Sequence, residues 1–309
     1  MNEKIRTARL SIYSNSFLVV SKLIIGFLSG SVSVISEAVH SGLDLFSSFI
    51  AYYSVKNSSL PADDEHKFGH GKIESLSGFT EGILIIFAGL LIVFESIKKL
   101  IEPTDIDKIG LAIIVMFLSS LINSIIARKL FKVSIKNNSI ALKADAMHLM
   151  IDVYTSLGVM FSLFIIWLME FLFKGKHFHF LDPLCAIIIS FIIIKTGYKL
   201  IKESSVELID TSLDAKEIET IKKLILSNDL ILSFKNLKTR KSGNLKFIEF
   251  DIIFDEKLSL KDAHREADNI SAKIREDLKD SQIIIHMEPC TKQCSDKECL
   301  DNCKLDINK

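Results

Sequence analysis

Residues 82–94 read GILIIFAGLLIVF and decide the class of this protein. An α-helix rises about 1.5 Å per residue, so roughly 20 mostly apolar residues cross the hydrocarbon core of a bilayer. The apolar stretch around these residues covers 76–98, which is long enough for such a span. Two further stretches, GVMFSLFIIW at 158–167 and LCAIIISFIII at 184–194, are just as apolar. A soluble protein could bury one such helix, but a series of them indicates a membrane protein.

We predict six transmembrane helices in the first 204 residues. Their expected ranges are 10–29, 32–55, 76–98, 109–130, 142–172 and 182–202. The start, MNEKIRTARL, is too polar for a cleaved signal peptide. Lysines and arginines are more frequent in the loops on the side of the N-terminus than in the opposite loops, which predicts that both termini are cytoplasmic. The simplest location is therefore the inner or plasma membrane of a prokaryote, which the chain crosses several times in contact with the lipid bilayer.

The overall composition conceals a second region of a different kind. The chain has 309 residues, of which 38 are basic, 38 are acidic and 25% in total are charged. This balance excludes the basic surface of a nucleic-acid-binding protein, and it excludes a highly charged disordered chain. Charged residues are concentrated after residue 204. We therefore predict a transmembrane domain at 1–204, a cytosolic domain at 205–290 and a cysteine-containing tail at 291–309.

Two of the predicted spans carry the same pair of ionisable residues. The second span contains His40 and Asp44, and the fifth contains His148 and Asp152. A spacing of four residues puts both side chains on one helix face, one turn apart. Two such helices facing each other offer two imidazoles and two carboxylates, which suits the tetrahedral preference of zinc(II). The carboxylates would also balance the charge of a divalent cation in a low-dielectric interior.

The alternative is that these residues only make polar contacts between helices. An ionisable side chain inside a bilayer costs at least ~2.5 kcal/mol on insertion scales, so its presence needs a reason. One pattern repeated in two spans favours the metal site. Glu37 and Asp145 each precede a histidine by three residues and share roughly the same helix face. We expect them near the site or its entrance, or else as solvated polar residues.

The segment after the second span, PADDEHKFGHGKIES at 61–75, is the third candidate motif. It places Asp63, His66 and His70 three and four residues apart, with Pro61 and Gly69 breaking regular structure around them. Aspartate and histidine side chains at such spacing can bind a first-row divalent ion. The alternative is an ordinary charged loop that is solvated and holds no metal.

Together, these motifs resemble the cation diffusion facilitator family over about residues 8–290. The resemblance implies a homodimeric transporter, not an enzyme, that exports zinc or a related divalent metal, commonly in exchange for protons. It implies a transport site at His40, Asp44, His148 and Asp152 and a second site at Asp63, His66 and His70. It also implies that Lys72 and Asp210 form a contact that holds the dimer together at the membrane–cytosol boundary. Family members selective for manganese tend to replace the histidines with harder oxygen ligands, so this chain favours zinc, with iron(II), cadmium and cobalt as alternatives.

The segment 205–290 predicts a small α+β domain with the element order αββαβ. Helices are expected at 214–228 and 259–278, two strands at 230–254 around a Ser242–Gly243 turn, and a short strand at 283–286. This pattern resembles the metallochaperone-like domain that dimerises in the family. In zinc-exporting members that domain can hold two metal ions, and the matching positions are Lys235, Asp251, His264, His286 and Glu288. A lysine ammonium has no lone pair to offer a metal. We therefore expect at most a single ion here, with solvated residues at a dimer interface as the alternative.

Four cysteines, Cys290, Cys294, Cys299 and Cys303, follow in the tail. Disulfides rarely persist in the cytosol, so clustered thiols suggest a thiophilic metal or a redox role. Their spacing differs from the Cys-x-x-Cys pattern of common zinc sites. A tail without metal is the alternative.

The sequence thus predicts a divalent metal/proton antiporter. Metal binding needs neutral histidines and ionised aspartates, so it releases protons, and metal release takes protons up. Two other classes remain open. A membrane-anchored metal sensor would use mainly the cytosolic sites. An intramembrane zinc hydrolase would need an open coordination position and a general base, and the sequence contains no HExxH motif for one.

Overall fold

The computed structural model describes residues 3–29, 32–101, 109–172, 181–291, 299–300 and 302–304. The chain forms two compact units, Met1–Ser205 and Val206–Lys309. Each unit has its own core, and the two are described separately below.

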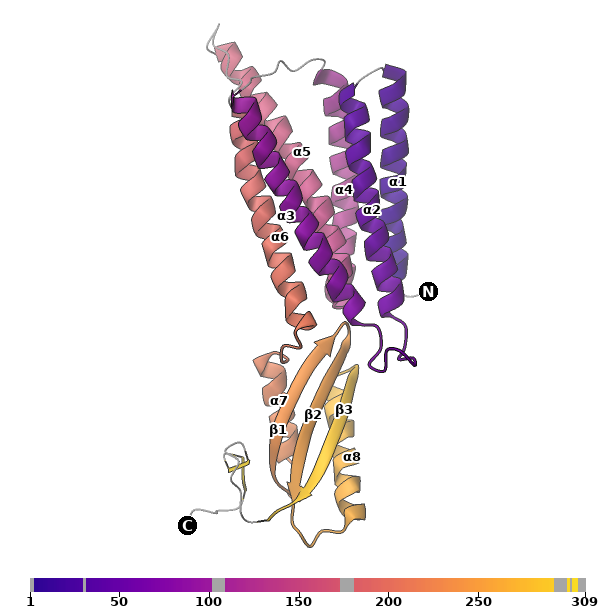
Figure 1. Ribbon diagram of the computed structural model, residues 1–309, viewed down its shortest axis with the longest axis vertical. Helices are drawn as coiled ribbons and strands as arrows, with labels where there is room; N and C mark the ends of the chain where they lie inside the picture. Colours follow the sequence, from indigo (N-terminus) through magenta and orange to yellow (C-terminus); the bar gives the residue numbers. More distant parts are fainter. Residues whose placement is uncertain are drawn as a thin grey trace. The chain divides into compact units, whose positions relative to one another are not determined.

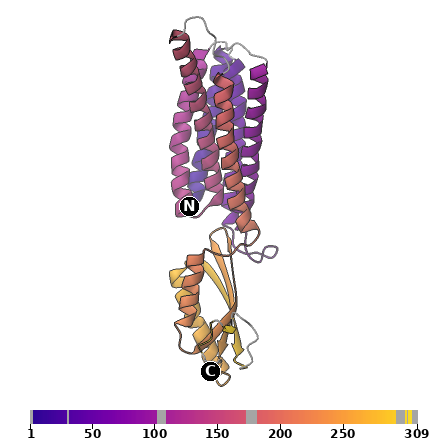
Figure 2. The ribbon, with the colours of Figure 1, turned by 90° about the vertical axis from the view of Figure 1, so that its left-hand side faces the viewer.

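The first unit is a bundle of long helices (Figures 1 and 2). They are α1 (Glu3–Ser29), α2 (Val32–Ser58), α3 (Lys72–Ile101), α4 (Ile109–Lys136), α5 (Ile140–Leu172) and α6 (Leu181–Leu208). Each segment expected to be helical lies in one of them. Most of the helices extend beyond the predicted range, because hydropathy marks only the apolar part of a helix whose ends continue into charged sequence.

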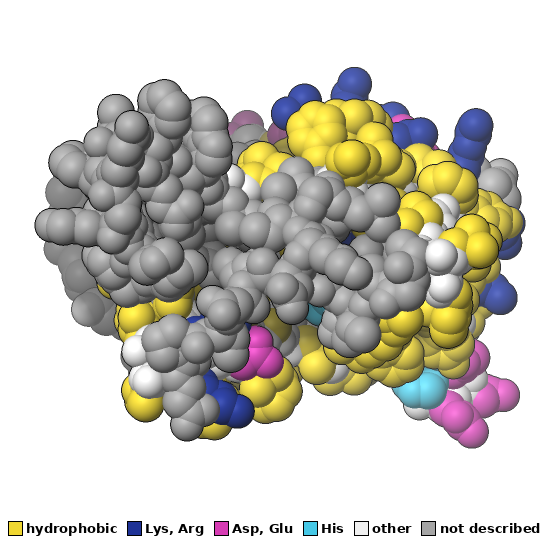
Figure 3. Space-filling model, turned by 90° about the horizontal axis from the view of Figure 1, so that it is seen from above, with side chains coloured by type: hydrophobic (Ala, Val, Ile, Leu, Met, Phe, Trp, Pro, Cys, Tyr) yellow, Lys and Arg dark blue, Asp and Glu magenta, His cyan; other side chains and the backbone are white. Residues whose placement is uncertain are grey.

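Four helices in the described part of the chain are long and apolar enough to cross a membrane. These stretches are Glu3–Leu28, Lys72–Ile101, Ile114–Lys136 and Pro183–Leu208, which belong to α1, α3, α4 and α6. The other two long helices, α2 and α5, are the ones that carry the His/Asp pairs. Large apolar side chains point away from the bundle, including Phe17, Phe46 and Phe191. Figure 3 shows hydrophobic side chains over much of the described periphery seen from above.

Small residues bring α3 and α6 close together, and the two helices run side by side in Figures 1 and 2. A Cβ added at Gly82 would lie 3.1 Å from the carbonyl oxygen of Gly197, and one added at Gly197 would lie 2.9 Å from that of Gly82. Such contacts let helix backbones approach closely in membrane bundles. At the end of the bundle where α1 begins, the buried Lys4 ammonium lies 3.0 Å from a Glu74 carboxylate oxygen, which links α1 to α3.

The second unit is a two-layer α+β domain with the order α7 (Ala215–Leu226), β1 (Ile231–Ser242), β2 (Leu245–Phe254), α8 (Leu260–Asp277) and β3 (Ser281–Pro289). The sheet order is β1-β2-β3, with β1 antiparallel and β3 parallel to β2. Gly243 has a φ of 59° in the turn between β1 and β2, a conformation that costs glycine little.

The core of this unit lies between the helices and the sheet (Figure 1). Its buried members include Ile221 and Ile225 of α7, Phe234 of β1, Phe250 of β2 and Ile270 of α8. The side chain of Ser259 accepts a hydrogen bond from the N–H of Asp262 at 3.2 Å and caps the start of α8. The opposite face and the edges of the sheet carry the charged residues considered below.

Candidate metal centres

The bundle brings the two His/Asp pairs of α2 and α5 together. His148 Nε2 lies 3.2 Å from Asp44 Oδ1, and His40 Nε2 lies 3.9 Å from Asp152 Oδ1. Each histidine therefore faces the aspartate of the other helix. Ligand atoms of His40, Asp44 and Asp152 all lie within 4.8 Å of one another, so these three side chains could hold one metal ion as they stand.

These side chains differ in exposure. The side chain of Asp44 is 5% exposed, that of Asp152 14% and that of His148 18%, whereas that of His40 is 56% exposed. A cavity of about 120 Å³ lies beside them and is lined by residues of α1, α2, α4 and α5. His40, Asp44 and Asp152 all contribute to its wall. The cluster therefore combines buried carboxylates with one accessible imidazole.

The cavity also contains polar residues that the sequence did not place there, and those of α4 were not predicted at all. Lys22 of α1 is buried, and its ammonium donates a hydrogen bond to Ser41 Oγ at 2.7 Å. Ser119, Ser120 and Asn123 of α4 also line the wall. The signal that could have revealed them is the presence of polar residues three and four positions apart in an otherwise apolar span.

Two more acidic residues lie inside the bundle. Asp145 and Glu81 are both fully buried. Asp145 Oδ1 accepts a hydrogen bond from Ser48 Oγ at 3.0 Å, and Asn15 Nδ2 donates to the same hydroxyl at 2.8 Å. Asp145 is therefore tied into a polar network between α1, α2 and α5 and is not an exposed entrance residue.

The loop between α2 and α3 gathers the third motif. Ligand atoms of Asp63, His66 and His70 lie within 4.8 Å of one another. Asp63 Oδ1 lies 3.5 Å from His66 Nδ1, and Asp63 Oδ2 lies 3.3 Å from His70 Nε2. Gly69, with a φ of 78°, supports the tight turn.

Backbone N–H groups also form hydrogen bonds with the carboxylate of Asp63 in this loop. The N–H of His66 donates to Asp63 Oδ1 at 2.6 Å, and the N–H of Glu65 donates to it at 3.0 Å. The hydrogen bond from His66 is the largest cause that lowers the pKa of Asp63 below its usual value. Asp63 is therefore anionic through the mildly acidic range, which is the form that binds a metal.

The candidate residues of the second unit are arranged differently. Lys235, Asp251 and His286 occupy one row across the three strands. The Lys235 ammonium lies 2.7 Å from a Glu288 carboxylate oxygen, and Asn236 Nδ2 donates to Asp251 Oδ2 at 2.7 Å. His264, on α8, lies 3.7 Å from Asp268 instead. His286 Nε2 lies 3.8 Å from Glu288 Oε1, but among the residues that the structure describes no three of these side chains have ligand atoms within 4.8 Å of one another.

The described part of the tail folds back on the edge of the sheet. Cys290 and Cys299 are buried in a small cluster with Ile253. Ser233 Oγ donates to the carbonyl of Cys299 at 2.7 Å. Cys303 is half-buried, and Cys294 lies outside the described residues. The thiols that are described do not group into a ligand set of three.

The two residues expected to link a dimer belong to different units. Lys72 begins α3 in the first unit, whereas Asp210 follows α6 in the second. Asp210 has a φ of 55°, and its Oδ1 lies 3.4 Å from a guanidinium nitrogen of Arg240. The expected contact between Lys72 and Asp210 therefore stays a prediction.

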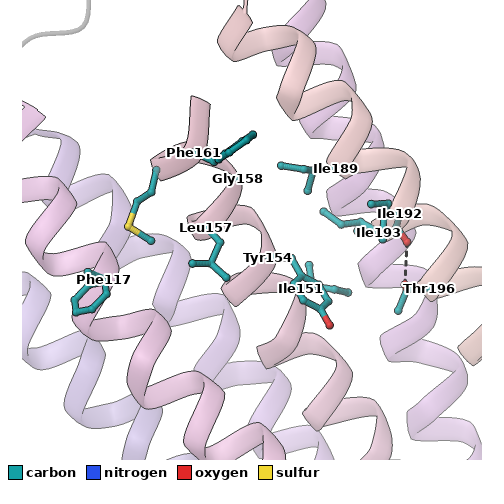
Figure 4. Close-up of a pocket in the computed structure, with 11 residues that line it drawn as sticks. Phe117, Ile151, Tyr154, Leu157, Gly158, Phe161, Ile189, Ile192, Ile193 and Thr196 are labelled. Atoms are coloured by element: carbon teal, nitrogen blue, oxygen red, sulfur yellow. Dashed lines mark hydrogen bonds between the residues drawn. The ribbon is translucent and has the colours of Figure 1, made fainter. Parts of the chain in front are cut away.

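A larger cavity in the first unit contrasts with the polar one. It has a volume of about 870 Å³ and lies between α4, α5 and α6 (Figure 4). Its wall is apolar except for the hydroxyls of Tyr154 and Thr196, and the latter donates to the carbonyl of Ile192 at 2.8 Å. Among the described residues that line this cavity there is no carboxylate or imidazole, so these residues offer no such ligand to a divalent cation.

Comparisons with known proteins point to a transport family. Residues 8–209 match the cation efflux transmembrane domain, and residues 213–290 match the cytoplasmic domain of cation efflux proteins. The chain is 32% identical over 263 residues to an uncharacterized transporter of Synechocystis sp., covering 85% of this chain and 83% of that relative. It is 30% identical over 276 residues to the cation-efflux pump FieF of Salmonella newport, covering 89% of each chain. It is 28% identical over 280 residues to protein p34 of Rickettsia prowazekii, covering 91% of this chain and 90% of the relative.

Solved structures that are similar to this chain include two that cover about a quarter of it. One, of the putative zinc transporter CzrB, is 27% identical and covers 26% of this chain and 99% of its own, with a TM-score of 0.25. Another is the metal-bound C-terminal domain of the CzcD transporter from Thermotoga maritima. It is 27% identical and covers 25% of this chain and 94% of its own, with a TM-score of 0.23.

Proposed function

The chain belongs to the cation efflux family of transporters, and on that premise we propose that it exports divalent metal ions, zinc first, through the cavity lined by α1, α2, α4 and α5. The observation that carries the proposal is the convergence of His40, Asp44 and Asp152, whose ligand atoms lie within 4.8 Å of one another. His148, hydrogen-bonded to Asp44, completes the set of four.

The chemistry of this set supports a divalent cargo. Two carboxylates balance the charge of a divalent cation, so the loaded site carries no net charge from these ligands. Imidazole nitrogen together with carboxylate oxygen suits zinc, and it also suits iron(II), cobalt and cadmium better than it suits manganese. Zinc is therefore the first cargo in this proposal, and the other three are alternatives.

We propose proton exchange as the driving force. A metal ion binds neutral imidazoles and ionised carboxylates, so loading the site displaces protons and unloading it takes protons up. If the site opens to the two sides of the membrane in turn, a proton gradient drives the metal in the opposite direction. The exposed imidazole of His40 gives such a site one ligand within reach of solvent.

We place all six helices of the first unit across the membrane, with both termini in the cytoplasm. The helices α2 and α5 carry the proposed ligands, and the buried Asp44 and Asp145 face the interior of the bundle. Large side chains of the same two helices, such as Phe46 and Tyr154, are exposed, as expected for contact with lipid.

The remaining sites have secondary roles in this proposal. Asp63, His66 and His70 would bind a second ion in the loop, where they already converge. We propose a homodimer held by the second unit, in keeping with the family, with Lys72 and Asp210 as its link. A single ion on Asp251, His264, His286 or Glu288, and a thiophilic ion on the tail cysteines, are weaker proposals because these side chains are dispersed or paired.

The test is zinc transport by the full chain in proteoliposomes with an imposed pH gradient. We expect zinc to accumulate on the more acidic side, and we expect Asp44→Ala and Asp152→Ala to abolish this flux. Asp277→Ala, which removes an exposed carboxylate at the end of α8, is the control and should transport normally. Normal zinc flux in both membrane variants would refute the proposal. Parallel assays with iron(II), cadmium, cobalt and manganese would rank the cargo.

A further inference from the structure

The proposed transport cavity continues past the His/Asp ligands onto α4. Its wall includes His40, Asp44 and Asp152 on one part, and Ser119, Ser120 and Asn123 of α4 on another. His148 is not among the residues that line it. An ion held by the three converging ligands would therefore lie in a cavity that α4 also lines. Residues of α4 could then occupy coordination positions that these three ligands leave open.

Two polar groups of this α4 wall are buried and lack a partner. Asn123 is 5% exposed and Ser120 is 6% exposed. Within the residues that the structure describes, neither Asn123 Oδ1 nor Ser120 Oγ has a hydrogen-bond partner. The hydroxyl of neighbouring Ser119, in contrast, donates to the carbonyl of Val115 at 2.8 Å. A buried amide oxygen without a donor is unfavourable, so a position like that of Asn123 is one where a ligand or a bound water is expected.

The cavity has room for more than a bare ion. Its volume is about 120 Å³. A water molecule occupies roughly 30 Å³ in the liquid, so the space suits an ion together with a few further ligands. Asp152 Oδ2, which also lacks a partner among the described residues, adds a third open oxygen to the same wall.

The chemistry of these groups differs from that of the His/Asp set. An amide oxygen is a hard, neutral ligand that adds a coordination position without adding charge. Zinc in a tetrahedral site has no need of it, whereas cobalt(II) and iron(II) readily take five or six ligands that include oxygen and water.

We propose that Asn123 is a further ligand of the transported ion, and that Ser120 holds a water molecule on that ion. This inference rests on the proposed transport function and extends it to the coordination number. The site then accepts ions that prefer five or six ligands, so cobalt(II) and iron(II) are cargo alongside zinc.

Cobalt(II) absorption tests the coordination number directly, because tetrahedral cobalt absorbs visible light several-fold more strongly than five- or six-coordinate cobalt. The sample is the full chain in detergent, in which Asp63→Ala removes the loop site. The spectrum of the same protein carrying Asp44→Ala and Asp152→Ala as well is subtracted, because it contains the cobalt bound outside the transport site. We expect the weak spectrum of five or six ligands. Asn123→Leu, of similar size, should give a stronger spectrum, because the ion loses one ligand. Asn123→Asp, which keeps an oxygen at this position, should retain the weak one. An unchanged spectrum in Asn123→Leu, or a strong tetrahedral spectrum before any change at Asn123, overturns the inference.

Transport gives a second, independent measurement. We expect the ratio of cobalt to zinc flux to fall several-fold in Asn123→Leu. Asn137→Leu is the matched control. It makes the same chemical change just after α4, where the amide donates to the carbonyl of Val133 at 2.9 Å, and it should keep the ratio. An equal loss for both metals in Asn123→Leu would indicate a packing role and overturn the inference.

If Asp44→Ala and Asp152→Ala abolish flux while the Asn123 variants keep the original ratio and spectrum, only this inference fails. Normal flux in the aspartate variants would instead refute the transport site.

Discussion

Both units place a buried or half-buried lysine beside candidate metal ligands, but the two lysines do different things. In the bundle, the Lys22 ammonium donates to the hydroxyl of Ser41 at 2.7 Å, next to the His/Asp cluster. In the second unit, the Lys235 ammonium lies 2.7 Å from a carboxylate oxygen of Glu288. The carboxylates of Asp44 and Asp152 lie beside histidines. The carboxylate of Glu288 lies beside both His286 and the Lys235 ammonium. The chemistry of the neighbours, more than the mere presence of His, Asp and Glu, decides which of the two clusters is ready for a metal.

The largest expected effect is the difference in zinc flux between replacing a histidine of the bundle cluster and replacing a histidine of the second unit. We expect His148→Ala to reduce zinc flux by at least about 100-fold, because even weaker supporting residues of metal sites contribute about 10- to 100-fold. His286→Ala, on the exposed strand β3, should keep most of the flux. The measurement is initial zinc flux in proteoliposomes at matched protein content. If the two variants lose flux equally, the distinction between the clusters is wrong.

In the loop site, the Asp63 carboxylate contacts the side chains of His66 and His70, so this cluster should also bind metal. Asp63→Asn removes one charged ligand, and we expect the zinc affinity of the loop to fall by roughly 10- to 100-fold, since interactions with charged groups contribute about 1.5–3 kcal/mol. Equilibrium dialysis of the full chain carrying Asp44→Ala and Asp152→Ala would measure this.

The pH dependence of the loop provides its own control. Hydrogen bonds from the backbone N–H groups of His66 and Glu65 lower the pKa of Asp63. Its carboxylate therefore stays ionised when the pH falls through the mildly acidic range, and it protonates only at lower pH than an ordinary aspartate does. We expect Asp63→Asn to weaken binding by the same factor at pH 7 and at pH 5.5. A difference between variant and parent that vanishes at pH 5.5 would contradict this account.

The positive charge of Lys22 should weaken zinc binding at the transport site, and replacing it tests this effect. A positive charge a few ångströms from a divalent ion opposes binding by more than about 1 kcal/mol even at an effective dielectric constant of about 20. We therefore expect Lys22→Met to tighten zinc binding at the transport site by about tenfold, about 1.4 kcal/mol. Lys22→Arg keeps the charge and should leave the affinity near its original value. Competition with a chelator, in the background of Asp63→Ala, would measure it, and equal affinities for Lys22→Met and Lys22→Arg would exclude a role for the charge.

The parts of these clusters that were predictable are those set by local spacing. His40 and Asp44 share a helix face because they are four residues apart, and Asp63, His66 and His70 share a short loop. The polar face of α4 can be read from the spacing of Ser119, Ser120 and Asn123, but that this face lines the same cavity as the His/Asp pairs was not predictable, because the rotation of one helix against another depends on packing along its whole length. The Lys235–Glu288 pair depends on the arrangement of β1, β2 and β3, which local pattern does not encode. Helix positions followed from hydropathy, since each apolar segment is long, whereas helix ends extended past them into charged sequence.

The smallest effect concerns the lysine of the second unit. The side chains of Lys235 and Glu288 are 22% and 32% exposed, so their ion pair is partly screened by solvent. We expect Lys235→Ala to lower the free energy of unfolding of this unit by less than about 1 kcal/mol. The same change removes a cation from the row that contains Asp251 and His286, so zinc affinity in this unit should rise a few-fold while transport stays unchanged. Lys238→Ala, on the exposed side of the same strand, is the matched control and should alter neither quantity. Zinc binding to the full chain, with both the transport and loop sites removed, would measure the change. If Lys235→Ala leaves zinc binding the same, contact with a lysine is not what separates the two clusters, and the dispersion of the ligands across β2, β3 and α8 is the sufficient reason.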